Sequence, residues 1–415
     1  MTRHTAKVRH WLVMAVLGLA GGVIFLLPFF QEVYYKPLSS ALSLNNTEVG
    51  SLLSAFGVTA MLSYFPGGWL ADQVSSRKLI SSSLLITGAL GVYFSSFPSY
   101  QISLLIHAAW GVSISLLFWG AMIRATRHWA PSGEQGKAFG VLETGRGVSE
   151  GLASVALLSI FGWLGSTEQA LSIVVLQCSI LILLLGVVSW FVFDDDNAVG
   201  EDTEEHAKID LKDVLELLRM PEVWLISLIV LTGYSAYWGT FRLTPYASDV
   251  FLMSVTAAGV MSVSKMFLKP LAALIAGLTA DKIGVAKTIG IIFTLMMVSF
   301  AVFAFLPSSA NLLPLMLLNV AVISIGVFAM RGIYFALLDE GGIPLKVTGT
   351  AAGIVSVLGF TPDIFMPLLG GVLIDQFPGQ QGYQYFFMTT AAICLIGLLA
   401  TVCLYKRYIV PRSPR

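Results

Sequence analysis

Twelve apolar segments follow one another along this chain of 415 residues. Each is long enough to cross the hydrocarbon core of a bilayer as an α-helix, which takes about 20 residues. Lipid offers no hydrogen-bonding partners, so each segment has to satisfy its own backbone groups, as a helix does. The segments lie at about 11–33, 49–71, 79–97, 101–126, 138–163, 168–192, 222–245, 252–276, 288–306, 311–337, 348–373 and 384–405. The sequence therefore predicts an all-α integral membrane protein with twelve transmembrane helices.

The overall composition agrees with a lipid environment. Charged residues make up 12% of the chain and hydrophobic residues 56%, with a mean hydropathy of +0.82. A soluble domain carries roughly 25% charged residues. The formal net charge is zero, which gives no support for a nucleic-acid partner. Cys178, Cys394 and Cys403 show no metal-ligand spacing, and we expect neither a metal nor another cofactor.

Basic residues gather between the predicted helices on one side of the membrane. They are Arg77, Lys78, Arg124, Arg127, Lys137, Lys282, Lys287 and Lys346, together with both basic termini. Cytoplasmic loops are enriched in lysine and arginine, so both termini are predicted to be cytoplasmic. The opposite loops carry little beyond Lys36 and Arg242. The first apolar run continues to about Phe30 without a small-residue cleavage pattern, which predicts a retained helix rather than a signal peptide.

A short, charged, glycine-rich stretch at 67–78 is repeated half a chain length later at 277–287, and Asp72 corresponds to Asp281. Such a repeat indicates two related halves. Between them lies an acidic run followed by an amphipathic segment, which we expect to lie along the inner membrane surface. We therefore predict two pseudo-symmetric six-helix bundles, 1–192 and 222–415, joined by a cytoplasmic linker, 193–221.

The repeated stretch resembles the cytoplasmic loop motif of the major facilitator superfamily, found between helices two and three and between helices eight and nine. The resemblance covers nearly the whole chain and implies two halves that alternate access around a midplane site. It also implies gating roles for Asp72, Arg77, Arg124 and Asp281, whose contacts would hold the cytoplasmic side closed. Arg77 lies one position later in the sequence than the arginine of the family motif.

Two other stretches resemble the organophosphate–phosphate antiporter and organic-anion transporter branches. They are 119–129, which contains Arg124, and 349–353. The antiporters place phosphate-clamping arginines on helices one and seven, where this chain has Phe29 and Tyr237. This departure argues against a sugar phosphate held by such a pair.

Seven charged residues are predicted at membrane depth. They are Glu143, Arg146 and Glu150 on helix five, Lys265 and Lys269 on helix eight, Arg331 on helix ten and Asp363 on helix eleven. A charge there costs about 2.5–3.5 kcal/mol on insertion scales, so it normally faces a cavity or a partner. We predict that Glu150 pairs with Lys265, and that Asp363 handles a proton or the substrate. For the charges of helices five and eight, the alternative is a buried network that only locks the bundles together. For Asp363, the alternative is an acid paired with Arg331 or with a backbone donor.

The charges and aromatic residues favour a transport function. Four of the seven charges are positive, and this small excess favours an anionic solute. Tyr237 and Trp238 are candidates for substrate contact. We predict a monomeric secondary transporter of a small organic anion in the cytoplasmic (inner) membrane, coupled to protons. An anion exchanger, a drug or lipid exporter, and a transport-dead sensor stay open as alternatives. The sequence shows no paired nucleophile and base of the kind that would indicate an enzyme.

Overall fold

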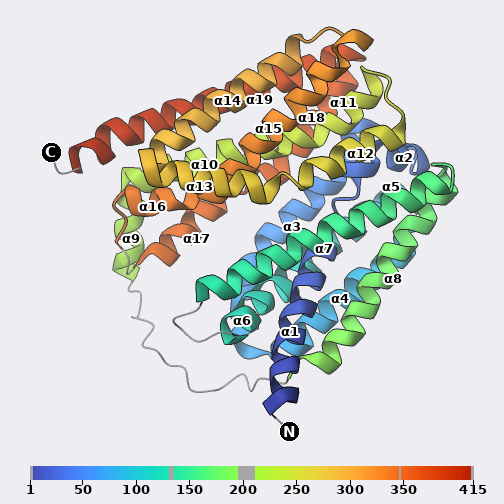
Figure 1. Cartoon of the computed structure of the whole chain (residues 1–415), viewed down its shortest axis with the longest axis horizontal. Coiled ribbons are helices and arrows are strands. Elements are labelled where there is room, and N and C mark those ends of the chain that lie inside the picture. Colours follow the sequence, from blue (N-terminus) through green and yellow to red (C-terminus); the bar gives the residue numbers. More distant parts are fainter. Residues whose placement is uncertain (1–2, 130–134, 195–210, 345–346, 413–415) are drawn as a thin grey trace. The chain divides into compact units, whose positions relative to one another are not determined.

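The computed structural model describes residues 3–129, 135–194, 211–344 and 347–412. Within these ranges every regular element is a helix (Figure 1), which confirms the all-α prediction. The chain forms two compact units. Unit 1 comprises Met1–Glu201 and Ser254–Val263, and unit 2 comprises Asp202–Met253 and Ser264–Arg415.

Unit 1 is built from apolar helices packed side by side. They are α1 (Arg3–Val23), α2 (Gln31–Ala41), α3 (Asn46–Gln73), α4 (Ser76–Phe94), α5 (Tyr100–Val112), the π-helix η1 (Ser113–Trp119), α6 (Gly120–Trp129), α7 (Gln135–Trp163) and α8 (Glu168–Val192). Helix α1 packs along α7, α3 along α5, and α4 along α8. These pairs bury one face of each helix and leave large apolar side chains exposed on the other, as lipid contact requires.

Unit 2 repeats this construction with more interruptions. Its elements are α9 (Leu211–Arg219), α10 (Pro221–Gly239), η3 (Thr240–Arg242), α11 (Leu243–Asp249), the end of α12 (Val255–Met266), α13 (Lys269–Ile283), α14 (Val285–Phe305), η4 (Ala310–Leu312), α15 (Leu313–Ile333), η5 (Tyr334–Ala336), α16 (Leu337–Glu340), α17 (Thr348–Gly359), α18 (Pro362–Gln376), α19 (Gln380–Leu404), η7 (Tyr405–Ile409) and η8 (Val410–Arg412). Helix α10 packs against α15, α17, α18 and α19.

The predicted spans coincide with these helices. Within the described residues, eight helical stretches are long and apolar enough to cross a membrane, and the other predicted spans coincide with α1, α3, α4 and α7. In the linker, α9 occupies most of the amphipathic segment, whereas the acidic run from residue 195 to 210 lies outside the described residues.

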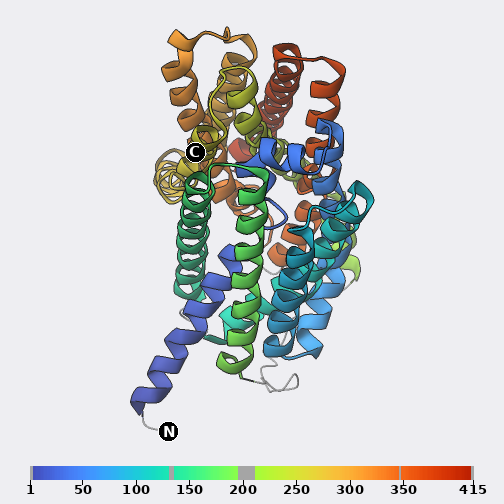
Figure 2. The same ribbon diagram turned by 90° about the vertical axis from the view of Figure 1, so that its right-hand side faces the viewer.

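Three spans predicted as continuous helices are interrupted. The first ends at Val23, and the chain turns through residues 24–30 before α2 begins at Gln31 (Figure 2). Pro28 lies in this turn, and it cannot donate a helical hydrogen bond. The eighth span is interrupted between α12 and α13, and the eleventh between α17 and α18, where Pro362 begins the second helix. Hydropathy does not register such breaks, because the residues that form them are mostly apolar.

Candidate functional site

Asp363 lies in the first turn of α18, directly after the interruption of the eleventh span at Phe360 and Thr361. Pro362 is the first residue of α18, a position where its missing N–H leaves no helical bond unmade. A carboxylate in this turn is stabilised by the positive end of the helix dipole. Its Oδ1 accepts a hydrogen bond from the indole Nε1 of Trp238 at 2.7 Å. The bond joins α10 and α18 inside unit 2.

Arg331 lies in the last turn of α15, with its guanidinium over two tyrosine rings of α10. Its Cζ is 4.3 Å from the ring centroid of Tyr237 and 5.7 Å from that of Tyr234. Guanidinium groups are attracted to aromatic faces, more strongly when water is excluded. Tyr234 is also close enough to Asp363 for the two side chains to interact. Unit 2 thus brings together Arg331, Tyr237, Trp238 and Asp363. The sequence predicts each of them as a candidate, and a pairing of Asp363 with Arg331 as one alternative.

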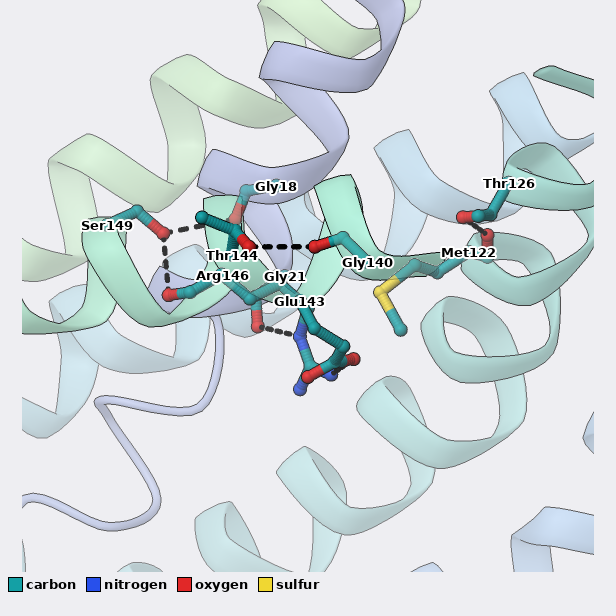
Figure 3. Close-up of polar contacts among 9 residues, drawn as sticks. All are labelled: Gly18, Gly21, Met122, Thr126, Gly140, Glu143, Thr144, Arg146 and Ser149. Atoms are coloured by element: carbon teal, nitrogen blue, oxygen red, sulfur yellow. Dashed lines mark hydrogen bonds and ion pairs between the residues drawn. The ribbon is translucent and has the colours of Figure 1, made fainter. Parts of the chain in front are cut away.

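A second cluster is centred on Arg146 in α7 (Figure 3). Its Nη1 lies 2.5 Å from Oε1 of Glu143, one turn earlier, and its Nε donates to the carbonyl oxygen of Gly21 at 3.2 Å. Gly21 is in the last turn of α1, where carbonyl groups lack helical donors and the dipole favours a cation. The guanidinium is 5.3 Å from the ring of Trp119 and 5.9 Å from that of Phe25.

Glycines bring α1 close to α7. A Cβ atom on Gly22 would lie 2.0 Å from Oγ of Ser149 and 2.4 Å from the carbonyl oxygen of Arg146. Ser149 donates from Oγ to the carbonyl of Gly18 at 3.0 Å (Figure 3). Small residues at a helix contact allow the backbones to approach. The glycines of α1 therefore bring the Gly21 carbonyl within reach of Arg146.

Lys265 is buried near the end of α12. Its Nζ lies 3.4 Å from the carbonyl oxygen of Thr240, at the end of α10, and 5.7 Å from the ring centroid of Phe241. The interruption between α12 and α13 separates Lys265 from Lys269, so the two do not lie one turn apart on a continuous helix. Glu150 is half-buried in α7. Its pairing with Lys265 would join the two units and stays a prediction.

The first copy of the loop motif is contacted by Arg124 of α6. Its Nη1 donates to the backbone carbonyl of Ala71, in the last turn of α3. Asp72 follows directly, but its side chain lies outside the described residues. Arg77, at the start of α4, lies over the ring of Trp190 in α8, with Cζ 4.4 Å from the centroid. The gating roles of these residues stay predictions.

The second copy of the loop motif is contacted by a carboxylate that is not among the predicted site residues. Asp281 is exposed near the end of α13. Glu340 of α16 accepts the backbone N–H of Ala286 on Oε2 at 2.7 Å, in the first turn of α14. Gly284 precedes this turn with a φ of +95°, a conformation that favours glycine. The sequence signal that could identify Glu340 is its position, just after the tenth predicted span and on the side of the basic loops.

Arg242 is buried, although the sequence analysis counts it among the charges of the outer loops. The seventh span continues through η3 into α11, so Arg242 lies inside unit 2. Its Nη2 donates to the carbonyl oxygen of Pro367 in α18 at 2.6 Å.

Among the described residues, no group of three or more His, Cys, Asp and Glu side chains could hold a metal ion.

Long apolar helices that carry arginines, acids and aromatic rings at membrane depth define a membrane transport protein for a small solute. A family model described as the Major Facilitator Superfamily matches residues 11–362, and the chain belongs to this superfamily.

Its relatives include proteins named for sugar-derived anions. The chain is 28% identical over 406 residues to the inner membrane protein YqcE of Escherichia coli K12, covering 96% of this chain and 95% of the relative. It is 26% identical to the probable galactarate/D-glucarate transporter GudP of Bacillus subtilis over 161 residues, or 37% of this chain and 34% of GudP. A probable hexose phosphate transport protein of Chlamydia muridarum is 23% identical over 242 residues, 52% of each chain.

The fold is similar to solved transporter structures. A bacterial homolog of the human lysosomal transporter Spinster aligns with a TM-score of 0.79, covering 98% of this chain and 99% of that one. The sequence identity is 14%, so this likeness shows the fold alone.

Proposed function

We propose that this chain is a secondary active transporter that carries a small organic anion by alternating access, with protons as the coupling ion. The observation that carries the proposal is the cluster of Arg331, Tyr234, Tyr237, Trp238 and Asp363 in unit 2. Its arginine supplies a positive charge for an anion, and its carboxylate supplies a site for a proton.

The packing of Arg331 suits it to bind an anion. An arginine at membrane depth costs about 2.5–3.5 kcal/mol, of which contacts with aromatic rings offset roughly 0.5–2 kcal/mol. Cζ of Arg331 lies over the rings of Tyr237 and Tyr234, 4.3 Å and 5.7 Å from their centroids. The N–H donors of the guanidinium lie in the plane of the group and point along its edges, where a carboxylate or phosphate can accept two parallel hydrogen bonds.

Asp363 links anion binding to protons. While the carboxylate is ionised, it balances the charge of Arg331. When it takes up a proton, the cluster gains a net positive charge and attracts an anion more strongly. By thermodynamic reciprocity, a bound anion then also favours proton uptake. The hydrogen bond from Trp238 keeps the carboxylate in place through this change.

The relatives suggest a polyhydroxylated anion as the substrate, because GudP is named for sugar acids and the Chlamydia protein for hexose phosphates. Phe29 and Tyr237 stand where the resembled antiporters have phosphate-clamping arginines, so we favour a sugar acid over a sugar phosphate. We further propose that the transporter is a monomer in the cytoplasmic membrane, with both termini in the cytoplasm.

Ligand-induced thermal stabilisation of the purified chain tests the proposal, with a panel of carboxylates, sulfonates, phosphates and amino acids. We expect a sugar acid such as D-glucarate to stabilise the protein. Arg331→Gln should weaken its binding by about 1.5–3 kcal/mol, the range for a hydrogen bond to a charged group, while the exposed Arg219→Gln in α9 should not. Stabilisation by hydrophobic cations alone would contradict the proposal and favour an exporter.

A further inference from the structure

We infer that Arg146 forms a second anion-binding site, in unit 1, and that Glu143 is its resident counter-ion, which an entering carboxylate displaces. The inference rests on the proposed anion transport for the chemistry of its ligand. It adds a residue that lowers the affinity for the substrate, a role that an ordinary binding residue does not have.

The guanidinium of Arg146 is held by one backbone hydrogen bond and by two neighbouring aromatic rings. Its Nε is engaged by the Gly21 carbonyl at the end of α1. The rings of Phe25 and Trp119 lie 5.9 Å and 5.3 Å from Cζ, which limits rotation of the group. With Nε engaged, the edge formed by Nη1 and Nη2 is the one that a carboxylate can approach with two parallel hydrogen bonds.

Glu143 occupies only part of this edge. One of its oxygens, Oε1, lies 2.5 Å from Nη1 (Figure 3). The side chain of Glu143 is 53% exposed, whereas that of Arg146 is 18% exposed. The acid therefore has room to swing away while the guanidinium stays anchored. A ligand carboxylate that takes both Nη1 and Nη2 competes with Glu143 for the same N–H group.

The competition has a measurable size. Ion pairs of this exposure are worth roughly 0.2–1 kcal/mol. At the upper end of that range, Glu143 pairs with Arg146 in about five of every six molecules. Only the remaining one in six can bind the anion, and the apparent affinity falls in proportion to this fraction. Removing the charge of Glu143 should then tighten anion binding up to about six-fold. If the pair only braced the helix, the same change would leave binding unaltered or weaken it.

The test is a double-mutant cycle on the full-length protein, with binding of D-glucarate and glucose 6-phosphate measured by calorimetric titration. The variants are Glu143→Gln, Arg146→Gln and the combination, with Glu168→Gln as an exposed acid at the far end of the same unit. We expect Glu143→Gln to lower the Kd up to about six-fold in the wild-type background. The gain should vanish in the Arg146→Gln background, and Glu168→Gln should give no gain.

The outcomes separate the inference from the proposed function. Failure of the wild-type protein to bind either anion overturns the proposed function. Binding by the wild type together with equal or weaker binding by Glu143→Gln overturns the inference alone. An equal gain with and without Arg146 also overturns it, because the effect would then be a general one of net charge. Should Arg146→Gln fail to fold, the single variant Glu143→Gln still decides the sign.

Discussion

Replacing Gly22 by alanine should separate α1 from α7 and disturb the Arg146 cluster. The added Cβ would lie 2.0 Å from Oγ of Ser149 and 2.4 Å from the carbonyl oxygen of Arg146. The serine side chain can rotate, but the carbonyl belongs to the backbone of α7, so the helices have to move apart. Overpacking of this kind costs about 1–3 kcal/mol.

The movement also lengthens the hydrogen bond from Arg146 to the carbonyl of Gly21, which is already 3.2 Å long. A hydrogen bond from a charged donor contributes roughly 1.5–3 kcal/mol. With partial loss of this bond, we expect Gly22→Ala to destabilise the protein by about 2–4 kcal/mol, from both terms. Anion binding should weaken as well, because Arg146 loses its anchor.

Gly147→Ala is a matched control, because it lies on α7 within a turn of Arg146 and a Cβ atom there would meet nothing within 4 Å. Alanine is a better helix former than glycine by roughly 1 kcal/mol, so this variant should be neutral or slightly more stable. Chemical unfolding in detergent, followed by tryptophan fluorescence, measures both. Equal stability of the two variants would refute the close packing of α1 on α7.

Three further changes test other parts of the account. Glu340→Ala removes the acceptor of the Ala286 N–H at the start of α14 and should lower stability by about 0.5–2 kcal/mol; unchanged unfolding would exclude this cap. Trp238→Phe removes the indole donor to Asp363 and should shift the pH profile of anion binding, whereas an unchanged profile would show that this hydrogen bond has no part in coupling. Asp72→Asn should abolish transport while leaving membrane insertion intact, and normal uptake would contradict a gating role.

Hydropathy and charge placement predict most of the fold. The spans depend on residue type and spacing, which the sequence displays directly. The division into two six-helix bundles and the sidedness of the loops stay predictions. The interruption of the first span is not predictable in this way. Gly21 and Gly22 are apolar like their neighbours, so hydropathy does not register the turn that follows α1. Pro28, which lies in this turn, is the local signal.

The candidate site was predictable in part. An ionisable residue inside an apolar span is easily recognised, so Arg146, Arg331 and Asp363 were all identified. Their partners were harder to predict, because the Gly21 carbonyl belongs to the backbone and carries no residue-type signal. Glu340 was missed because it follows the end of a span, where acids are common.

Transport itself tests the central claim most directly. The chain is reconstituted into proteoliposomes, and uptake of labelled D-glucarate is followed with and without an inward proton gradient. The account predicts accumulation that requires the gradient, collapses with a protonophore and is lost in Arg331→Gln. Binding of the anion without uptake or counterflow, in vesicles shown to contain inserted protein, would contradict it.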